Sequence, residues 1–404
     1  MKSTTIAVTL IVATAAAVAL YPALQSASTQ PPLAGNPIEL QPVAPASNQQ
    51  QRIEVVFVLD TTGSMGGLIE AAKEKVWSIA SNMASAEAAP EISIGLVAYR
   101  DRGDDYVTRT VDLSPDLDSI YATLMDFQAD GGGDGPESVN QALDEAVNAI
   151  SWSQNGSTYK VIFLVGDAPP HMDYQDDVKY PVTLASARKH GIVVNSIQCG
   201  SNRSATVKWE QIARLGGGRY FQVEQAGSAV AIATPYDNEI ASLSKQLDQT
   251  RLYYGSKSEK EKQRRKVAAA DKLHAGASVE SRARRAAFNA SESGRTNFLG
   301  QGELVDDVTS GRLDLDSIKK DQLPEPMQAL APAARRALVE DTARRRSELS
   351  GKIESLTRQR ASYLQEKVAE HGDTEASLDY KIFSAIREQA EQKGLNYESD
   401  GMAY

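Results

Sequence analysis

The chain has 404 residues, a formal net charge of −10 at pH 7 and an aromatic content of only 6%. This length allows two domains, or one domain with a long extension. The excess of acidic residues argues against a general nucleic-acid-binding protein, because such proteins need a basic surface. The single cysteine, Cys199, cannot form a disulfide within the chain, and no cysteine or histidine spacing matches a zinc site.

The N-terminal segment is typical of an export signal. Lys2 precedes an apolar run from Thr5 to Leu20, and small residues follow it. Residues 29–51 are rich in proline, glutamine and serine, which favours an extended linker. We therefore expect residues 1–28 to be a signal peptide or an inner-membrane anchor. The folded part would then lie in a bacterial periplasm or cell envelope, or be secreted.

A buried strand that ends in polar residues opens the folded part. Val55 to Leu59 is an apolar run, and Asp60–Thr61–Thr62–Gly63–Ser64 follows it at once. A helical pattern begins after Gly66–Gly67. A buried strand followed directly by a helix is typical of a parallel α/β sheet, in which ligands bind at the carboxyl ends of the strands.

Further strands alternate with helices in the same way. They are predicted at residues 92–100, 160–167, 193–200 and 218–223. The short polar turn 101–105 indicates that residues 106–111 form an antiparallel edge strand, and Ser114–Pro115 should open the next helix. Residues 52–250 are therefore expected to form a doubly wound, mostly parallel sheet with one antiparallel edge strand. Residues 251–404 should form a charged, mainly helical C-terminal region.

Two more polar loops bear on function. The strand at 160–167 ends in Asp167, and the loop Gly131–Gly132–Gly133–Asp134 precedes a helical pattern. Three adjacent glycines are costly in chain entropy unless the backbone needs unusual dihedral angles or close contact. The loop could present Asp134 to a metal, cradle a phosphate, or serve as a plain linker. It lacks the lysine of a P-loop.

The C-terminal region contains a heptad-like pattern. Leu349, Ile353, Leu356 and Tyr363 recur at this spacing, and Arg360 interrupts the apolar row. The pattern predicts a helical hairpin or short coiled coil, which could mediate self-association. An amphipathic helix packed on its own domain explains the pattern equally well.

The segment from Arg52 to Glu224 resembles the von Willebrand factor type A domain family in its bacterial extracellular form. Residues 60–64 are similar to the D-x-S-x-S motif of that family, with Thr62 in place of the first serine, and Gly166–Asp167 matches the third loop of the motif. The stretches 95–101 and 212–221 also look like this family. The second loop departs from the usual Gly-Gly-Thr, because Gly133 and Asp134 stand there instead.

The resemblance implies a metal-ion-dependent adhesion site. Its expected ligands are Asp60, Thr62, Ser64, Asp134 and Asp167, with Asp134 replacing the missing threonine hydroxyl. Mg²⁺, or Mn²⁺ or Ca²⁺, suits such hard oxygen donors, and a partner Asp or Glu would complete the coordination shell.

We therefore interpret the protein as an exported, non-enzymatic, metal-dependent protein-interaction protein of adhesion type, with no nucleic-acid partner. Two alternatives stay open. One is a Mg²⁺-dependent phosphoryl-transfer or hydrolytic enzyme that uses Asp60, with His171 as a general base. The other is a structural envelope protein whose metal site only stabilises the domain. Ser64 lies in no G-x-S-x-G sequence, which argues against a hydrolase of that type.

Overall fold

The computed structural model describes residues 50–87, 89–133, 135–226, 232–371 and 378–397, and Gln50–Tyr404 group as one compact unit. The expected signal peptide and most of the expected linker therefore lie outside the described residues. None of the described helices is long and apolar enough to cross a membrane.

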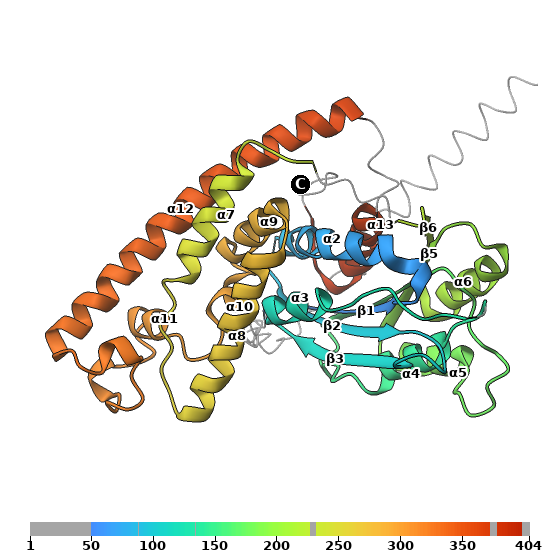
Figure 1. The fold of residues 1–404 in the computed structure, drawn as a ribbon, viewed down its shortest axis with the longest axis horizontal. Coiled ribbons are helices and arrows are strands. Elements are labelled where there is room, and N and C mark those ends of the chain that lie inside the picture. Colours follow the sequence, from blue (N-terminus) through green and yellow to red (C-terminus); the bar gives the residue numbers. More distant parts are fainter. Residues whose placement is uncertain (1–49, 88, 134, 227–231, 372–377, 398–404) are drawn as a thin grey trace, which may run out of the picture. The chain divides into compact units, whose positions relative to one another are not determined.

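One six-stranded sheet forms the centre of the fold (Figure 1). Its strands are β1 (Arg52–Asp60), β2 (Glu91–Tyr99), β3 (Thr108–Ser114), β4 (Tyr159–Gly166), β5 (Ile192–Cys199) and β6 (Gly217–Val223). Their order is β3-β2-β1-β4-β5-β6, and only β3 runs antiparallel to its neighbour. This topology confirms the predicted fold class of a doubly wound sheet with one antiparallel edge strand.

The sheet is buried on both faces. Successive side chains of a strand point to opposite sides, so each strand contributes to two cores. In β1, Val55, Phe57 and Leu59 belong to one core, and Val56 and Val58 to the other. The first core is covered by α2 (Gly66–Ala84) and α3 (Leu117–Leu124), and the second by α4 (Val139–Asn148), α5 (Tyr180–Lys189) and α6 (Arg203–Gly216).

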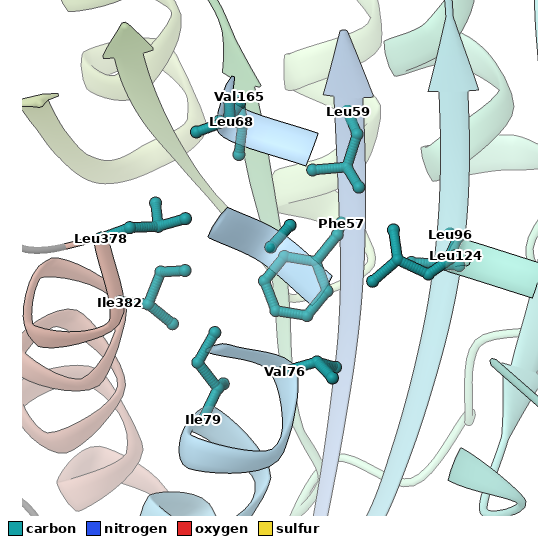
Figure 2. Close-up of a pocket in the computed structure, with 11 residues that line it drawn as sticks. Phe57, Leu59, Leu68, Val76, Ile79, Leu96, Leu124, Val165, Leu378 and Ile382 are labelled. Atoms are coloured by element: carbon teal, nitrogen blue, oxygen red, sulfur yellow. The ribbon is translucent and has the colours of Figure 1, made fainter. Parts of the chain in front are cut away.

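The C-terminal helix α13 (Leu378–Ala390) completes the first core. Figure 2 shows Leu378 and Ile382 of this helix facing Phe57 of β1 across an apolar cavity of about 30 Å³. A buried ion pair between Lys75 of α2 and Asp379 joins the two helices at 3.1 Å. The expected boundary at residue 250 stays a prediction, but α13 shares its core with the sheet.

Between β6 and α13 the chain forms a helical segment. Its helices are α7 (Asp237–Asp248), α8 (Lys257–Gly276), α9 (Val279–Ala290), α10 (Arg295–Leu299), α11 (Leu304–Thr309) and α12 (Pro332–His371). Short 3₁₀ turns lie at η1 (Gly63–Met65), η2 (Leu315–Ser317), η3 (Glu325–Met327) and η4 (Glu391–Lys393). At 1.5 Å per residue, the 40 residues of α12 span about 60 Å.

The heptad residues of α12 pack against another helix of the same chain. Leu349 and Ile353 are buried in one cluster with Ile240, Leu243 and Leu247 of α7. Arg360, which interrupts the apolar row, is 2% exposed and donates to Asp237 at the start of α7 at 2.7 Å. Arg346 donates to the carbonyl of Thr250, just after the end of α7, at 2.8 Å. The two helices therefore pack antiparallel, and self-association stays an untested prediction.

The helical segment docks on the sheet domain through α3 and α9. Arg285 of α9 is fully buried and contacts both carboxylate oxygens of Asp118 of α3 at 2.6 Å. It also donates to Asp248 of α7 at 2.8 Å. Beside it, Phe288 of α9 packs on Trp77 of α2 with ring centroids 6.0 Å apart. This junction combines a buried ion network with aromatic contact.

Candidate metal centre

The carboxyl ends of β1 and β4 lie side by side where the strand order of the sheet reverses, which is the usual ligand position in such sheets. Leu59 pairs with Val165, so Asp60 and Asp167 emerge from neighbouring strands. Gly166 stands between them, and a Cβ there would lie only 3.0 Å from the side chain of Asp60. Glycine at this position therefore leaves room for the Asp60 carboxyl.

Asp60 is completely buried at the end of β1. Its Oδ1 accepts hydrogen bonds from the backbone nitrogen of Thr62 at 2.9 Å and from the Thr62 hydroxyl at 2.7 Å. Its Oδ2 accepts none from any described residue. Burial raises the pKa of Asp60 to about 7, and the charge of Asp167 adds to this against the hydrogen bonds from Thr62. This carboxyl lacks a charge partner.

Thr62 and Ser64 lie on alternating positions of the turn after β1. Thr62 is buried, and its hydroxyl is 3.4 Å from that of Ser64. Ser64 is exposed and lines a pocket of about 240 Å³. The polar side chains of this turn therefore extend from the buried Asp60 to the exposed Ser64.

The glycine-rich loop folds over this turn. Gly131 and Gly132 have φ angles of +75° and +78°, which favour glycine. The backbone nitrogen of Gly132 donates to the carboxylate of Asp104 at 3.1 Å, and the carbonyl of Gly131 accepts from Gly63 at 3.2 Å. The loop is thus fixed by close backbone contacts. Asp134, the predicted ligand in this loop, lies outside the described residues.

Glu137 is a site residue that the sequence interpretation missed. It is 4% exposed and lines the same pocket as Ser64 and Asp167. Its Oε2 has no hydrogen-bond partner among the residues described. Burial, reinforced by the charge of Asp60 and other nearby acids, raises the pKa of Glu137 to about 9. A second buried carboxyl group therefore lies at this edge without a counter-charge.

The backbone of Glu137 is held by the loop that follows β4. Its nitrogen donates to the carbonyl of Pro169 at 2.9 Å, and its carbonyl accepts from the nitrogen of His171 at 3.0 Å. This short parallel bridge fixes the glutamate beside the carboxyl end of β4. An acid placed directly before α4 was the available sequence signal, but its contact with the Asp167 loop depends on tertiary structure.

The pocket joins loops from four strand ends. Its lining comprises Ser64, Gly135, Glu137, Asp167, Ala168, Cys199, Ser201, Asn202 and Gln225. The structure thus brings Asp60, Thr62, Ser64 and Asp167 to one edge, with Asp60 and Thr62 buried beneath the rim. Cys199 is buried at the end of β5, and burial raises the pKa of its thiol, as expected for a small apolar filler.

His171 is buried rather than surface-exposed, with a side-chain exposure of 5%. Its Nδ1 lies 2.8 Å from Asp173 and its Nε2 lies 3.3 Å from Asp101, while its ring stacks on Tyr174 at a centroid distance of 4.0 Å. These contacts place a carboxylate of the surrounding loops beside each ring nitrogen. They give His171 a role in fixing those loops.

The oxygen donors at this edge fit a hard divalent cation. No group of three histidine, cysteine, aspartate or glutamate side chains in the described part of the chain could hold a metal by itself. A cation site therefore requires the hydroxyls of Thr62 and Ser64 in addition to carboxylates. The buried free oxygens of Asp60 and Glu137 can supply the carboxylate ligands of such a site. Oxygen atoms are the ligands that Mg²⁺, Mn²⁺ and Ca²⁺ prefer.

The fold and the edge site define a doubly wound α/β domain with a polar pocket at its topological switch point. The family model for the von Willebrand factor A domain matches residues 54–235. We conclude that this segment is a von Willebrand factor A domain, as the sequence motifs suggested.

The chain is similar in part to several known proteins. The von Willebrand factor A domain-containing protein 7 of Rattus norvegicus is 41% identical over 91 residues, which are 22% of this chain and 10% of that protein. The alpha-protein kinase vwkA of Dictyostelium discoideum is 27% identical over 121 residues, 30% of this chain and 19% of the kinase. The crystal structure of the SpRpn10 VWA domain covers 44% of this chain and 91% of that domain, with 15% identity and a TM-score of 0.34. The chain thus spans less than a fifth of these two curated relatives.

Proposed function

We propose that this edge of the sheet holds a divalent cation, Mg²⁺ or else Mn²⁺ or Ca²⁺, as a metal-ion-dependent adhesion site. A partner protein would bind the cation through an aspartate or glutamate. The observation that supports this most is the pair of buried carboxyl groups, Asp60 and Glu137, whose free oxygens accept no hydrogen bond from described residues. Burying such a group without a compensating charge is unfavourable, and a cation would provide that charge.

The side chains divide the work in this proposal. Thr62 and Ser64 contribute hydroxyl oxygens, while Asp60, Asp167 and Glu137 contribute carboxylates, directly or through water. Asp134 remains a predicted ligand. A cation such as Mg²⁺ takes six oxygens at about 2.1 Å, and the bound ion would offer a positive centre for one carboxylate from outside.

The charge of the surrounding loops makes the cation essential for such a partner. The loops at this edge contain twelve acidic and four basic residues, counted over residues 60–65, 100–107, 126–138, 167–179 and 200–203. A carboxylate that approaches the edge without a cation meets repulsion, and this repulsion weakens with salt. Binding of an acidic partner should therefore be strictly metal-dependent.

We favour a binding role over the enzymatic alternative. The histidine considered as a base, His171, contacts Asp101 and Asp173 rather than Asp60. The shared segment with an alpha-protein kinase covers only 19% of that kinase. The third alternative, a metal that only stabilises an envelope protein, is separated from adhesion by the second experiment below.

We also propose that the protein is exported to the bacterial cell envelope. The support is the sequence of residues 1–28, with its basic start and apolar run. Cell fractionation combined with N-terminal sequencing of the mature protein tests this directly. Intact protein found only in the cytosolic fraction would contradict export.

The first experiment measures metal binding by the full chain. Calorimetric titration with Mg²⁺, Mn²⁺ and Ca²⁺ should show one saturable site, which Asp60→Ala abolishes. Asp105→Ala is the matched control, because Asp105 is an exposed acid of the same edge and does not line the pocket. Absence of binding of any of these ions to the folded protein would overturn the proposal.

The second experiment identifies the partner chemistry. A random peptide display library is panned on the immobilised protein in Mg²⁺ and eluted with EDTA. The eluted peptides should share an aspartate or glutamate, and Ser64→Ala should recover none. A protein that binds Mg²⁺ but retains no EDTA-eluted peptides would favour the purely stabilising metal instead.

A further inference from the structure

Gln225 is the second residue after the end of β6, and it lines the pocket. Its Nε2 lies 2.7 Å from Oδ2 of Asp167 and 3.3 Å from the backbone oxygen of Ser64. Both partners are acceptors, so the nitrogen end of the amide must face them. No sequence motif pointed to this residue, and it belongs to none of the predicted ligands.

The opposite end of the amide is also restrained. A Cβ on Gly200 would lie 2.3 Å from Oε1 of Gln225, so the oxygen rests against the backbone of this glycine. Gly200 itself has a φ of +71° and donates its nitrogen to the carbonyl of Val223 at 2.9 Å. The amide is therefore oriented by contacts with the ends of three strands, β1, β4 and β5.

We infer that Gln225 is a positioning residue of the proposed cation site. Its hydrogen bond holds one oxygen of Asp167 and ties it to the Ser64 turn, so that both keep a fixed separation. Carboxylates that bind metals are oriented by such outer hydrogen bonds, and their loss typically weakens metal affinity 10- to 100-fold. This inference rests on the proposed function.

The position of Gln225 in the chain gives the contact a second consequence. The residue lies at the start of the connection from β6 to α7, through which the chain leaves the sheet for the helical segment. The geometry of the metal centre thus depends on a residue outside the motifs that define it.

The test is a calorimetric Mg²⁺ titration of full-length Gln225→Ala and Gln225→Leu beside the wild type. Both variants should bind Mg²⁺ about 10- to 100-fold more weakly, with the thermal midpoint of the metal-free protein unchanged. Gln222→Ala is the matched control, because Gln222 lies on β6 and donates to Gly200 instead of Asp167. Its affinity should equal that of the wild type.

The variant Gln225→Glu distinguishes a residue that donates a hydrogen bond to Asp167 from one that binds the cation directly. This side chain cannot donate to Asp167 and repels it, so a positioning role predicts weaker binding, whereas a direct ligand predicts tighter binding. Wild-type affinity in Gln225→Ala, or tighter binding by Gln225→Glu, would overturn the inference. A wild-type protein that binds no Mg²⁺ would instead overturn the proposed function, before any variant is made.

Discussion

The buried acids of this protein fall into two regions with opposite surroundings. At the edge of the proposed cation site, Asp60 and Glu137 each leave an oxygen without a described partner. At the junction of α3 and α9, Asp118 and Asp248 share Arg285, with contacts of 2.6 and 2.8 Å. Burial is nearly complete in both regions, so the difference lies in the counter-charge.

The pKa values follow that difference. Burial raises the pKa of Asp60 to about 7 and that of Glu137 to about 9. Burial acts in the same direction on Asp118 and Asp248, but the charge of Arg285 outweighs it and lowers the pKa of both. A buried acid with an arginine is a structural contact, whereas the buried acids without one are the candidate ligands of the proposed cation site.

The largest expected effect is the loss of Arg285. Arg285→Met removes the arginine that two buried carboxylates share and should lower the free energy of unfolding by about 3–5 kcal/mol, although Arg251 and His274 still contact Asp248. Urea unfolding of the full chain measures this. Arg219→Met is the control, because the Arg219–Glu388 pair is largely exposed and should contribute less than about 1 kcal/mol. Equal losses in the two variants would break the comparison.

Lowering the pH should reduce the stability that Arg285 contributes. Because the folded pKa of Asp118 and Asp248 is lowered, their stabilisation is full above the unfolded value of about 3.9 and is lost as pH falls through the folded values. The stability gap between wild type and Arg285→Met should therefore be largest near pH 7 and narrow below about pH 4. Urea midpoints between pH 3 and pH 7 measure this gap. A constant gap would mean that the ion network contributes little.

The sequence was informative about the edge region because its residues are local. Asp60, Thr62 and Ser64 lie within one turn after an apolar strand, and a strand end predicts a position at the carboxyl edge. The alternation of strands and helices predicted the doubly wound sheet in the same way. These features depend on spacing along the chain, which the sequence displays directly.

The remaining features depend on contacts between distant residues. Glu137 is placed by Pro169, Gln225 by Asp167, and α13 packs on a strand more than 300 residues earlier. The heptad pattern was visible, but it could not show that Asp237 neutralises Arg360.

The prediction that Ser114–Pro115 opens a helix was wrong, because Ser114 still belongs to β3. The helix begins at Leu117, and Asp116 caps it by accepting a hydrogen bond from the nitrogen of Ser119. The serine hydroxyl instead accepts from the nitrogen of Asp116 at 3.0 Å, which places the cap two residues later.

Removal of an acid from the edge of the proposed cation site should raise the stability of the metal-free protein, whereas Arg285→Met should lower it. Asp60→Asn keeps the shape of the side chain but removes a buried group that lacks a counter-charge, so the metal-free protein should gain about 1 kcal/mol. If the proposed site binds Mg²⁺, the ion should raise the thermal midpoint of the wild type but not that of this variant. Thermal unfolding with EDTA or with Mg²⁺ measures both. A less stable metal-free variant would mean that Asp60 already has a partner.

The smallest effect concerns the junction of α2 and α13, where a buried ion pair adjoins the apolar cavity of about 30 Å³. Val76 lines this cavity together with Leu378 and Ile382. Val76→Ile adds one methyl group to the space and should raise the free energy of unfolding by about 0.5–1 kcal/mol. Val182→Ile on the exposed surface of α5 is the control and should change little. A gain at Val76 alone would show that apolar packing around the Lys75–Asp379 pair still limits how firmly α13 is held. A loss would show that the side chains around the cavity cannot shift to accept the added group.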